Sequence, residues 1–382
     1  MKKINVLSVF GTRPEAIKMA PLVKALEKDA RFCSKVAVTG QHREMLDQVL
    51  KVFNIIPEYD LNIMKQGQTL PNLTTKILDG MTLILEKEKP DIVLVHGDTV
   101  TTMASTIAAF YQKIKVGHVE AGLRTRNKWS PFPEEINRQV TDVISDIYFA
   151  PTFESKKNLL EENHPEDAIF VTGNTAIDAM QYTISKKYQH KDLPKKNEKM
   201  ILVTMHRREN LGVPMRKVFR GIARVAKHYP AIQIVFPMHR NPSVRKDARE
   251  ILEKIRNIHL IEPLEVVDFH NFAAKSFLIL TDSGGVQEEA PSLGVPVLVL
   301  RDTTERPEGV AAGTLKLIGT EEDSIFKETI RLIEDEEKYN SMARASNPYG
   351  DGKASIRILE SLASYFHCVD KSLETSKEIL FP

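Results

Sequence analysis

The sequence predicts a two-domain α/β protein in which each domain is built on a doubly wound, Rossmann-like parallel sheet. Three observations carry this prediction. Short apolar runs rich in Val and Ile alternate with longer amphipathic segments, which is typical of βα units. This alternation occurs twice along the chain. The length of 382 residues exceeds one ordinary domain and suffices for two of similar size.

The first half contains the short apolar runs that a buried parallel sheet favours. We expect its strands at Val6–Phe10, Val36–Thr39, Ile92–Val95, Val116–Val119, Ile147–Phe149 and Ile169–Val171. The first domain is therefore assigned to residues 1–172.

The second half repeats the pattern, and its domain is assigned to residues 173–353. We expect strands at Ile201–Met205, Ile232–Phe236, Ile258–Ile261, Phe277–Thr281, Val295–Leu300 and Leu315–Ile318. We expect the chain to cross from the first domain to the second at Gly173 and along the polar stretch 186–199, with Gly173 as a hinge. The closing helix, about 354–382, carries an apolar stripe that must be buried, formed by Ile356, Leu359, Leu362 and Phe366.

Composition excludes several classes of protein. The 53 basic and 51 acidic residues nearly balance, and no long basic stretch predicts nucleic-acid binding. Cys33 and Cys368 are too few for a disulfide scaffold and lack metal-ligand spacing, so we expect reduced thiols in a cytoplasmic protein. The apolar run after Lys3 has no cleavage site behind it, and no run reaches membrane-spanning length, so no membrane association is expected.

The turn Asp282-Ser283-Gly284-Gly285 follows an apolar strand and opens a helix. Free backbone N–H groups at a helix start attract anions, and the two glycines let a diphosphate approach the backbone. Glu289, further along this helix, could hold ribose hydroxyls. The alternative is a tight turn capped by Ser283 with a solvated Glu289.

The segment Gly11 to Lys18 opens the first helix, with Thr12 suited to its cap and Pro14 to its first turn. Arg13 and Lys18 lie near the positive end of this helix, where cations are unfavourable, and this indicates an anionic partner. A surface pair with extended apolar stems is the alternative.

Three acids follow strands or begin a helix at the expected rim of the first domain. Asp98 ends one strand, Glu120 ends the next, and Glu134 begins a helix. Carboxylates gathered from separate segments repel one another, which raises some of their pKa values and suits them to proton transfer. Taken singly, each could be a cap or an ion-pair partner.

His206 follows the first strand of the second half, beside Arg207 and Arg208, and could contact a phosphate or a leaving group. A structural histidine is the alternative. Arg306, in a loop after a later strand, is a further candidate for substrate binding.

Missing motifs narrow the chemistry. The sequence has no G-x-G-x-x-G after a strand, no P-loop, no Asp-x-Asp pair and no H-E-x-x-H. We therefore expect no nicotinamide, no other cofactor and no metal, so that positive charge comes from Arg, Lys, His and backbone N–H groups.

Eight motifs between Val6 and Gly352 together resemble the non-hydrolysing UDP-N-acetylglucosamine 2-epimerases of bacteria. They are GTRPEAIKMAPLV, VLVHGDT, GHVEAGLRT, SPFPEEINR, GNTAID, HRRENLG, TDSGGVQEEAPSLG and RDTTERPEG. The resemblance implies two domains facing a central cleft, as in GT-B glycosyltransferases, and a last helix packed back on the first domain. It also implies a homodimer that interconverts UDP-GlcNAc and UDP-ManNAc for bacterial surface polysaccharide synthesis.

The resemblance also implies roles for individual residues. Asp98, Glu120, Glu134 and His206 match the catalytic residues of the family, and Arg13 and Lys18 match substrate contacts. The UDP-binding set is matched by Phe269, Ser283, Gly284, Gly285, Glu289 and Arg306. A second UDP-GlcNAc, acting as an activator, would contact Gln41, Arg43, Gln68, Arg208 and His239.

The chemistry of the substrate dictates an indirect route. The hydrogen at C2 of this sugar is not next to a carbonyl, so UDP must leave first to give a glycal, and must then add back while a proton reaches the opposite face of C2. Which carboxylate is the base and which the acid stays open. The alternatives are a GT-B glycosyltransferase, a hydrolysing epimerase that releases ManNAc, and a nucleotide-sugar sensor without turnover.

Overall fold

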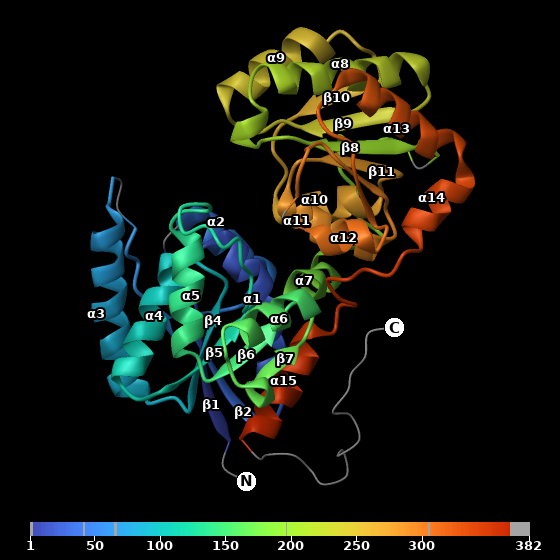
Figure 1. Ribbon diagram of the computed structural model, residues 1–382. Helices are drawn as coiled ribbons and strands as arrows, with labels where there is room; N and C mark the ends of the chain where they lie inside the picture. The colour runs from blue at the N-terminus through green and yellow to red at the C-terminus, as the bar shows by residue number, and fades with distance from the viewer. Residues whose placement is uncertain (1–2, 41–42, 65–66, 196, 305, 367–382) are drawn as a thin grey trace. The chain divides into compact units, whose positions relative to one another are not determined.

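The computed structural model describes residues 3–40, 43–64, 67–195, 197–304 and 306–366 (Figure 1). These residues form two compact units. Unit 1 comprises the described residues of Met1–Tyr182 and Tyr349–Pro382, and unit 2 is formed within Thr183–Pro348. Each unit is a parallel sheet with helices on both faces, which confirms the predicted fold class.

Unit 1 contains a seven-stranded sheet in the order β3-β2-β1-β4-β5-β6-β7. Its strands are β1 Ile4–Phe10, β2 Phe32–Val38, β3 Tyr59–Asp60, β4 Ile92–His96, β5 Lys115–Val119, β6 Ile147–Ala150 and β7 Ile169–Val171. Its helices are α1 Arg13–Lys28, α2 Arg43–Val52, α3 Leu70–Glu88, α4 Val100–Tyr111, α5 Glu134–Ile144, α6 Phe153–Glu161, η1 Glu166–Ala168, α7 Thr175–Thr183 and α15 Ala354–Tyr365.

Two apolar layers hold the sheet of unit 1. One joins α1, α2 and α15 to one face of the sheet, and the other joins α3 and α4 to the opposite face (Figure 1). Because both faces are covered, the strands are almost continuously apolar, which is why their positions can be predicted from short Val and Ile runs.

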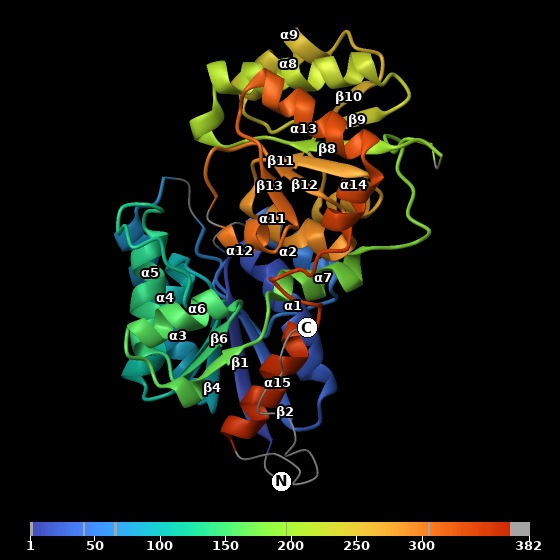
Figure 2. The ribbon, with the colours of Figure 1, turned by 45° about the vertical axis from the view of Figure 1, so that its right-hand side comes forward.

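Unit 2 contains a six-stranded sheet in the order β10-β9-β8-β11-β12-β13. Its strands are β8 Met200–Thr204, β9 Gln233–Pro237, β10 Ile258–Ile261, β11 Leu278–Thr281, β12 Val297–Val299 and β13 Leu315–Leu317. Its helices are η2 Arg208–Asn210, α8 Val213–His228, α9 Pro242–Leu252, α10 Val266–Ala274, α11 Gly284–Glu289, η3 Ala290–Leu293, α12 Pro307–Ala311, α13 Glu322–Glu334 and α14 Glu336–Ala343. Figure 2 shows α8, α9 and α13 on one face of this sheet, with α11 and α12 on the other.

The strand order reverses at one place in each sheet. In unit 1 this place lies between β1 and β4, and in unit 2 between β8 and β11. Loops that leave neighbouring strands in opposite directions open a crevice there, which is where doubly wound sheets bind ligands. The candidate loops starting at Gly11, Gly97, His206 and Asp282 all follow these four strands.

The helix α7 belongs to unit 1 up to Tyr182, although the boundary predicted from sequence lies at 172/173. Polar contacts explain the difference. Asp178 accepts hydrogen bonds from the backbone N–H groups of Ala354 (3.1 Å) and Ser355 (2.8 Å), and Gln181 donates to the carbonyl of Gly352 (2.6 Å). These contacts join α7 to the segment that opens α15.

The described part of the closing helix packs on unit 1, with Leu359 and Leu362 buried. Ile356 differs from its predicted place in the apolar stripe, since it is 58% exposed, and Ile358 is buried instead. The buried side of this helix is therefore rotated relative to the predicted stripe. Residues 367–382 lie outside the described residues.

Among the described residues, no helix combines the length and the apolar character that crossing a bilayer requires.

Candidate active site

Glu120 follows β5 and has a backbone φ of +66°, in the left-handed region. A residue with a side chain is held there at a cost of about 1–3 kcal/mol, so its surroundings must impose the conformation. The backbone N–H groups of Glu120 and Ala121 both donate to the carbonyl of Phe149, at 3.1 and 3.2 Å. The turn thereby directs the Glu120 carboxylate, whose side chain is 12% exposed, toward the loop after β4.

Lys18 and Asn174 both bind the same carboxylate oxygen of Glu120. The Lys18 ammonium forms an ion pair with Oε2, and the Asn174 amide donates to Oε2 at 3.2 Å. Lys18 is predicted from sequence to contact an anionic ligand, and in this structure its ammonium pairs with Glu120. Arg13, the first residue of α1, is half-buried.

The start of α1 is held by a capping box, as the sequence predicts for Thr12. The Thr12 hydroxyl accepts from the Glu15 N–H, and the Glu15 carboxylate accepts from the N–H groups of Gly11 (3.0 Å) and Thr12 (2.7 Å). Thr99 also donates to Glu15 at 2.6 Å. Glu15 thus joins the loop after β1 to the loop after β4.

Asp98 lies in the loop after β4, and Arg138 of α5 donates to its Oδ2 at 2.6 Å. Burial raises the pKa of Asp98, the Arg138 guanidinium opposes this rise, and the negative charges of Glu120 and Glu134 add to it. Two of the three acids predicted from sequence, Glu120 and Glu134, therefore act on the third, Asp98, inside unit 1. A carboxyl group with a raised pKa among other carboxylates is suited to exchange a proton.

Glu134 is the first residue of α5 and is half-buried. Its neighbour Glu135 is fully buried and accepts hydrogen bonds from the backbone N–H groups of Thr125 and Arg126. Arg138 also lies 3.5 Å from Glu135. The start of α5 is therefore fixed to the loop that follows Glu120.

His96, at the end of β4, is a neighbour of Glu120 that is not among the candidates predicted from sequence. It is 3% exposed, and its Nε2 lies 3.8 Å from Glu120 Oε2. Burial lowers the pKa of His96 to about 3, although the charge of Glu120 opposes the shift. His96 is therefore a neutral imidazole at neutral pH.

A buried polar frame, formed by His118, Asp142 and Arg124, connects the loop that carries Asp98 to the loop that carries Glu120. His118 lies between two acceptors, the Asp142 carboxylate (2.6 Å) and the Gly97 carbonyl (2.7 Å). Asp142 also accepts from the Gly122 N–H at 3.3 Å and pairs with Arg124 at 2.7 Å. Because Gly97 precedes Asp98 and Gly122 lies two residues after Glu120, this frame sets the positions of both acids.

In unit 2, Asp282 organises the loop that carries His206. Asp282 is fully buried and accepts from the backbone N–H groups of His206 and Arg207 and from the Asn210 amide, at 2.9–3.1 Å. The imidazole of His206 stacks on that of His239, with ring centroids 5.7 Å apart. Burial lowers the pKa of His206, the charge of Asp282 opposes this, and Arg207 and His239 lower it further.

The glycine turn after β11 lies beside two guanidinium groups. A Cβ added to Gly284 would lie 3.4 Å from Arg207 Nη2 and 3.7 Å from Arg306 Nη2. Arg306 is oriented by an ion pair with Glu288. Because α11 is only six residues long, the two arginines supply more of the positive charge here than a helix dipole can.

The remaining residues of the predicted UDP set lie in the same unit. The backbone N–H of Ser283 donates to Thr281 (2.9 Å), and Glu289 lies 3.5 Å from the buried His270. Phe269 is partly buried against the apolar layer of α10 and α11. The structure thus groups His206, Ser283, Gly284 and Arg306 in unit 2, and Lys18, Asp98, Glu120 and Glu134 in unit 1.

The five residues predicted to hold an activator are divided between the units. In unit 1, Arg43 pairs with Asp60 and with Asp47 (3.0 Å), and Gln68 is half-buried. In unit 2, His239 stacks on His206, and Arg208 begins η2. Gln41 lies outside the described residues.

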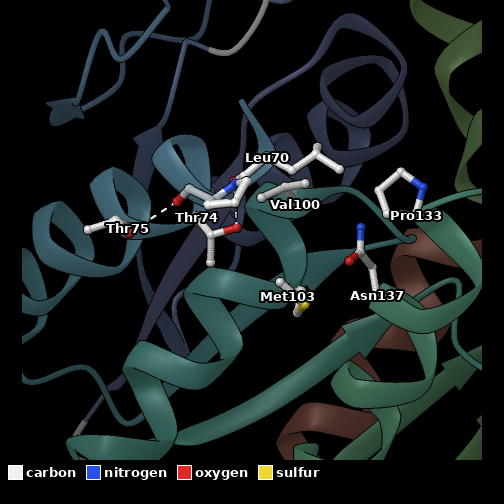
Figure 3. A pocket seen from close by; sticks show the side chains of 8 residues that line it. Leu70, Thr74, Thr75, Val100, Met103, Pro133 and Asn137 are labelled. Atoms are coloured by element: carbon white, nitrogen blue, oxygen red, sulfur yellow. Dashed lines mark hydrogen bonds between the residues drawn. The ribbon is translucent and has the colours of Figure 1, made fainter. Parts of the chain in front are cut away.

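A pocket of about 440 Å³ opens in unit 1 among the first turns of α3, α4 and α5. Figure 3 shows Leu70 and Thr74 on one side and Pro133 and Asn137 on the other, with Val100 and Met103 from α4. Asn137 also donates to the backbone carbonyl of Asp98 at 2.9 Å. Through Asn137 of α5, the pocket therefore lies next to the loop that carries Asp98.

Comparison with known proteins identifies relatives over nearly the whole chain. A family model described as UDP-N-acetylglucosamine 2-epimerase matches residues 24–363. The UDP-N-acetylglucosamine 2-epimerase of Bacillus subtilis is 60% identical, over 96% of this chain and 97% of its own.

Solved structures agree with this match. A crystal structure of a putative UDP-N-acetylglucosamine 2-epimerase from Listeria monocytogenes has a TM-score of 0.93 and 55% identity, over 97% of this chain and 98% of its own. The UDP-GlcNAc 2-epimerase from Neisseria meningitidis, solved with UDP-GlcNAc bound, has a TM-score of 0.85 and 54% identity, over 94% of this chain and 100% of its own. A glycosyltransferase of kitacinnamycin shares the fold alone, with a TM-score of 0.62 and 12% identity.

Proposed function

The chain belongs to the UDP-N-acetylglucosamine 2-epimerase family, and we propose from this premise that it interconverts UDP-GlcNAc and UDP-ManNAc by the non-hydrolysing route. One observation supports this reaction most directly: burial and the charges of Glu120 and Glu134 raise the pKa of Asp98 in unit 1. Epimerisation at C2 requires a proton to be removed from one face and a proton to be returned to the other.

Unit 2 holds the UDP moiety in this proposal. The Gly284-Gly285 turn admits the diphosphate, and Arg207 and Arg306 beside it match the charge of its oxygens. Glu289 and Phe269 line the same part of unit 2 and would contact the nucleoside. His206, whose pKa is lowered, would act as a neutral hydrogen-bond donor to the leaving diphosphate rather than as a cation.

The reaction proceeds by elimination and re-addition. A carboxylate takes the C2 proton, the C2–H electron pair forms the C1=C2 double bond of a glycal, and the C1–O pair leaves with UDP. UDP oxygen then attacks C1 again while a carboxylic acid delivers a proton to the opposite face of C2. Lys18 and Arg13 would contact the substrate, and no cofactor or metal enters these steps.

The product would supply bacterial surface polysaccharide synthesis in the cytoplasm. The bacterial source of the relatives supports this assignment. A second UDP-GlcNAc would act as an activator through Arg43, Gln68, Arg208 and His239, and Gln68 lies two residues before Leu70 of the α3 pocket.

Self-association into a homodimer is supported by apolar side chains on α3, α4 and α5. Leu83, Phe110, Tyr111 and Val143 are each 58–75% exposed. Exposed large apolar side chains on neighbouring helices are typical of subunit interfaces. Val143→Arg should yield a monomer by light scattering, and a protein that is monomeric without any substitution would contradict the dimer.

Product analysis tests the proposed reaction. With UDP-GlcNAc as the sole substrate, the protein should produce UDP-ManNAc at equilibrium with UDP-GlcNAc, detected by NMR and mass spectrometry. Release of free ManNAc would indicate the hydrolysing reaction, and turnover only with an added acceptor would indicate a glycosyltransferase. Binding without turnover would identify a sensor. Asp98→Asn and Glu120→Gln should each lower turnover at least about 100-fold.

A further inference from the structure

Asn174 has no part in the reaction as proposed above, yet it contacts one of the proposed catalytic carboxylates. It lies between β7 and α7 and is 4% exposed. Its Nδ2 donates to Glu120 Oε2 at 3.2 Å, and its Oδ1 accepts from the backbone N–H of Ala176 at 2.9 Å. The side chain thus has two separable functions, one toward Glu120 and one toward the first turn of α7.

The backbone of Asn174 is also fixed. Its N–H donates to the carbonyl of Tyr349 at 2.7 Å, and Tyr349 is the first residue of unit 1 after the chain returns from unit 2. Gly350 lies beside it, since an added Cβ there would be 3.5 Å from the Asn174 nitrogen, an ordinary contact distance. An amide anchored on both sides can orient the carboxylate it contacts.

The charges around Glu120 show what this amide contributes. Lys18 reaches Glu120 from α1, His96 from β4 and Asp98 from the loop after β4, and Asn174 approaches from the start of α7. Lys18 and Asn174 both donate to Oε2. Two donors on one oxygen fix the rotation of the carboxylate about its own axis and stabilise its ionised form.

We propose that Asn174 is a positioning residue, which holds the ionised Glu120 carboxylate in the orientation that proton transfer at C2 requires. This inference rests on the catalytic role proposed for Glu120. If the Asn174 amide only capped α7, Asn174→Ala would be the more damaging substitution. If it also positions Glu120, Asn174→Asp should be the more damaging one.

Two substitutions separate positioning from capping. Asn174→Asp keeps an oxygen for the Ala176 N–H, removes the donor to Glu120 and adds a negative charge beside it. Asn174→Ala removes both contacts. Positioning predicts that kcat falls about 10-fold in Asn174→Ala and more in Asn174→Asp, with KM changed less than about 3-fold. It also predicts that the acid limb of the pH profile of kcat/KM moves to higher pH, further in Asn174→Asp.

Gln181→Ala provides the matched control. Gln181 also joins α7 to the returning chain, through its 2.6 Å bond to the Gly352 carbonyl, but no contact links it to Glu120 among the described interactions. Melting temperatures measured alongside show whether each variant folds. Gln181→Ala should leave the pH profile where it is in the unsubstituted protein.

The outcomes are distinct. An Asn174→Asp variant with unchanged kcat and pH profile would overturn the inference, as would a Gln181→Ala variant that shows the same pH shift. If Glu120→Gln abolishes epimerisation while Asn174→Asp remains fully active, this inference fails and the proposed function stands. If the unsubstituted protein makes no UDP-ManNAc, the function and the inference fail together.

Discussion

The guanidinium of Arg138 lies 2.6 Å from the carboxylate of Asp98, and it is the main force that opposes the raised pKa of that acid. Arg138 itself is buried, so solvent screens the interaction only weakly. The pKa of Asp98 should therefore depend strongly on this contact.

Arg138→Met should raise the pKa of Asp98 further, because burial and the neighbouring acids are then opposed by Lys18 alone. Titration of the carboxyl carbons by ¹³C NMR would measure the shift. Arg126→Gln is the control, since Arg126 is an exposed arginine of the same unit that pairs with Glu161. An unchanged Asp98 pKa in Arg138→Met would refute the role of this contact.

Gly11→Ala should destabilise unit 1 by about 3 kcal/mol, the upper end of what overpacking usually costs. An added Cβ would lie 2.0 Å from Thr39 Oγ1 and 2.5 Å from Thr101 Oγ1, two hydroxyls that are hydrogen-bonded to each other at 2.9 Å. Urea unfolding would measure the loss. The control Gly313→Ala meets no atom within 4 Å and carries only the strain of its positive φ, about 1–2 kcal/mol. Equal losses in the two variants would contradict the steric explanation.

His96→Asn should make the protein less sensitive to acid. The pKa of His96 is lowered to about 3 in the folded protein, whereas the unfolded chain binds the proton near pH 6.5. Stability is therefore lost as pH falls from about 6.5 toward 3, and this histidine accounts for about 2 kcal/mol between pH 7.5 and pH 5. Urea unfolding at these two pH values should show a smaller difference in the variant. Parallel losses in both proteins would show that His96 does not carry the effect.

Arg306→Gln should weaken UDP binding about 10-fold or more, because it removes a cation beside the Gly284 turn. Isothermal titration calorimetry would measure the affinity, and its dependence on salt should also become weaker. Arg224→Gln serves as the control, since Arg224 forms surface pairs with Glu322 and Asp323. If Arg224→Gln and Arg306→Gln bind UDP equally well, the diphosphate binds elsewhere.

The fold could be predicted from sequence because its strands are buried on both faces. Each predicted apolar run is a strand, with ends shifted by a few residues. The strand β3 is missed because its two residues, Tyr59 and Asp60, form no apolar run. Ile356 is misplaced because spacing alone does not determine which of two neighbouring apolar positions faces the core.

The candidate site could be predicted in part, for a related reason. Loops that follow adjacent parallel strands share one edge of a sheet, so Asp98 and Glu120 could be grouped without a structure. Their partners could not, because Lys18, Arg138 and Asn174 reach them across 40 to 102 positions of sequence. Only Arg138 leaves a local signal, since it lies one helical turn after Glu134 on α5.

In the proposed reaction a proton leaves C2 and another returns during each cycle. When the enzyme is incubated with UDP-GlcNAc in heavy water, both UDP-ManNAc and recovered UDP-GlcNAc should carry deuterium at C2 and at no other sugar carbon, as read by NMR. UDP-ManNAc that forms without deuterium at C2 would contradict the elimination route and the role assigned to the carboxylates of unit 1.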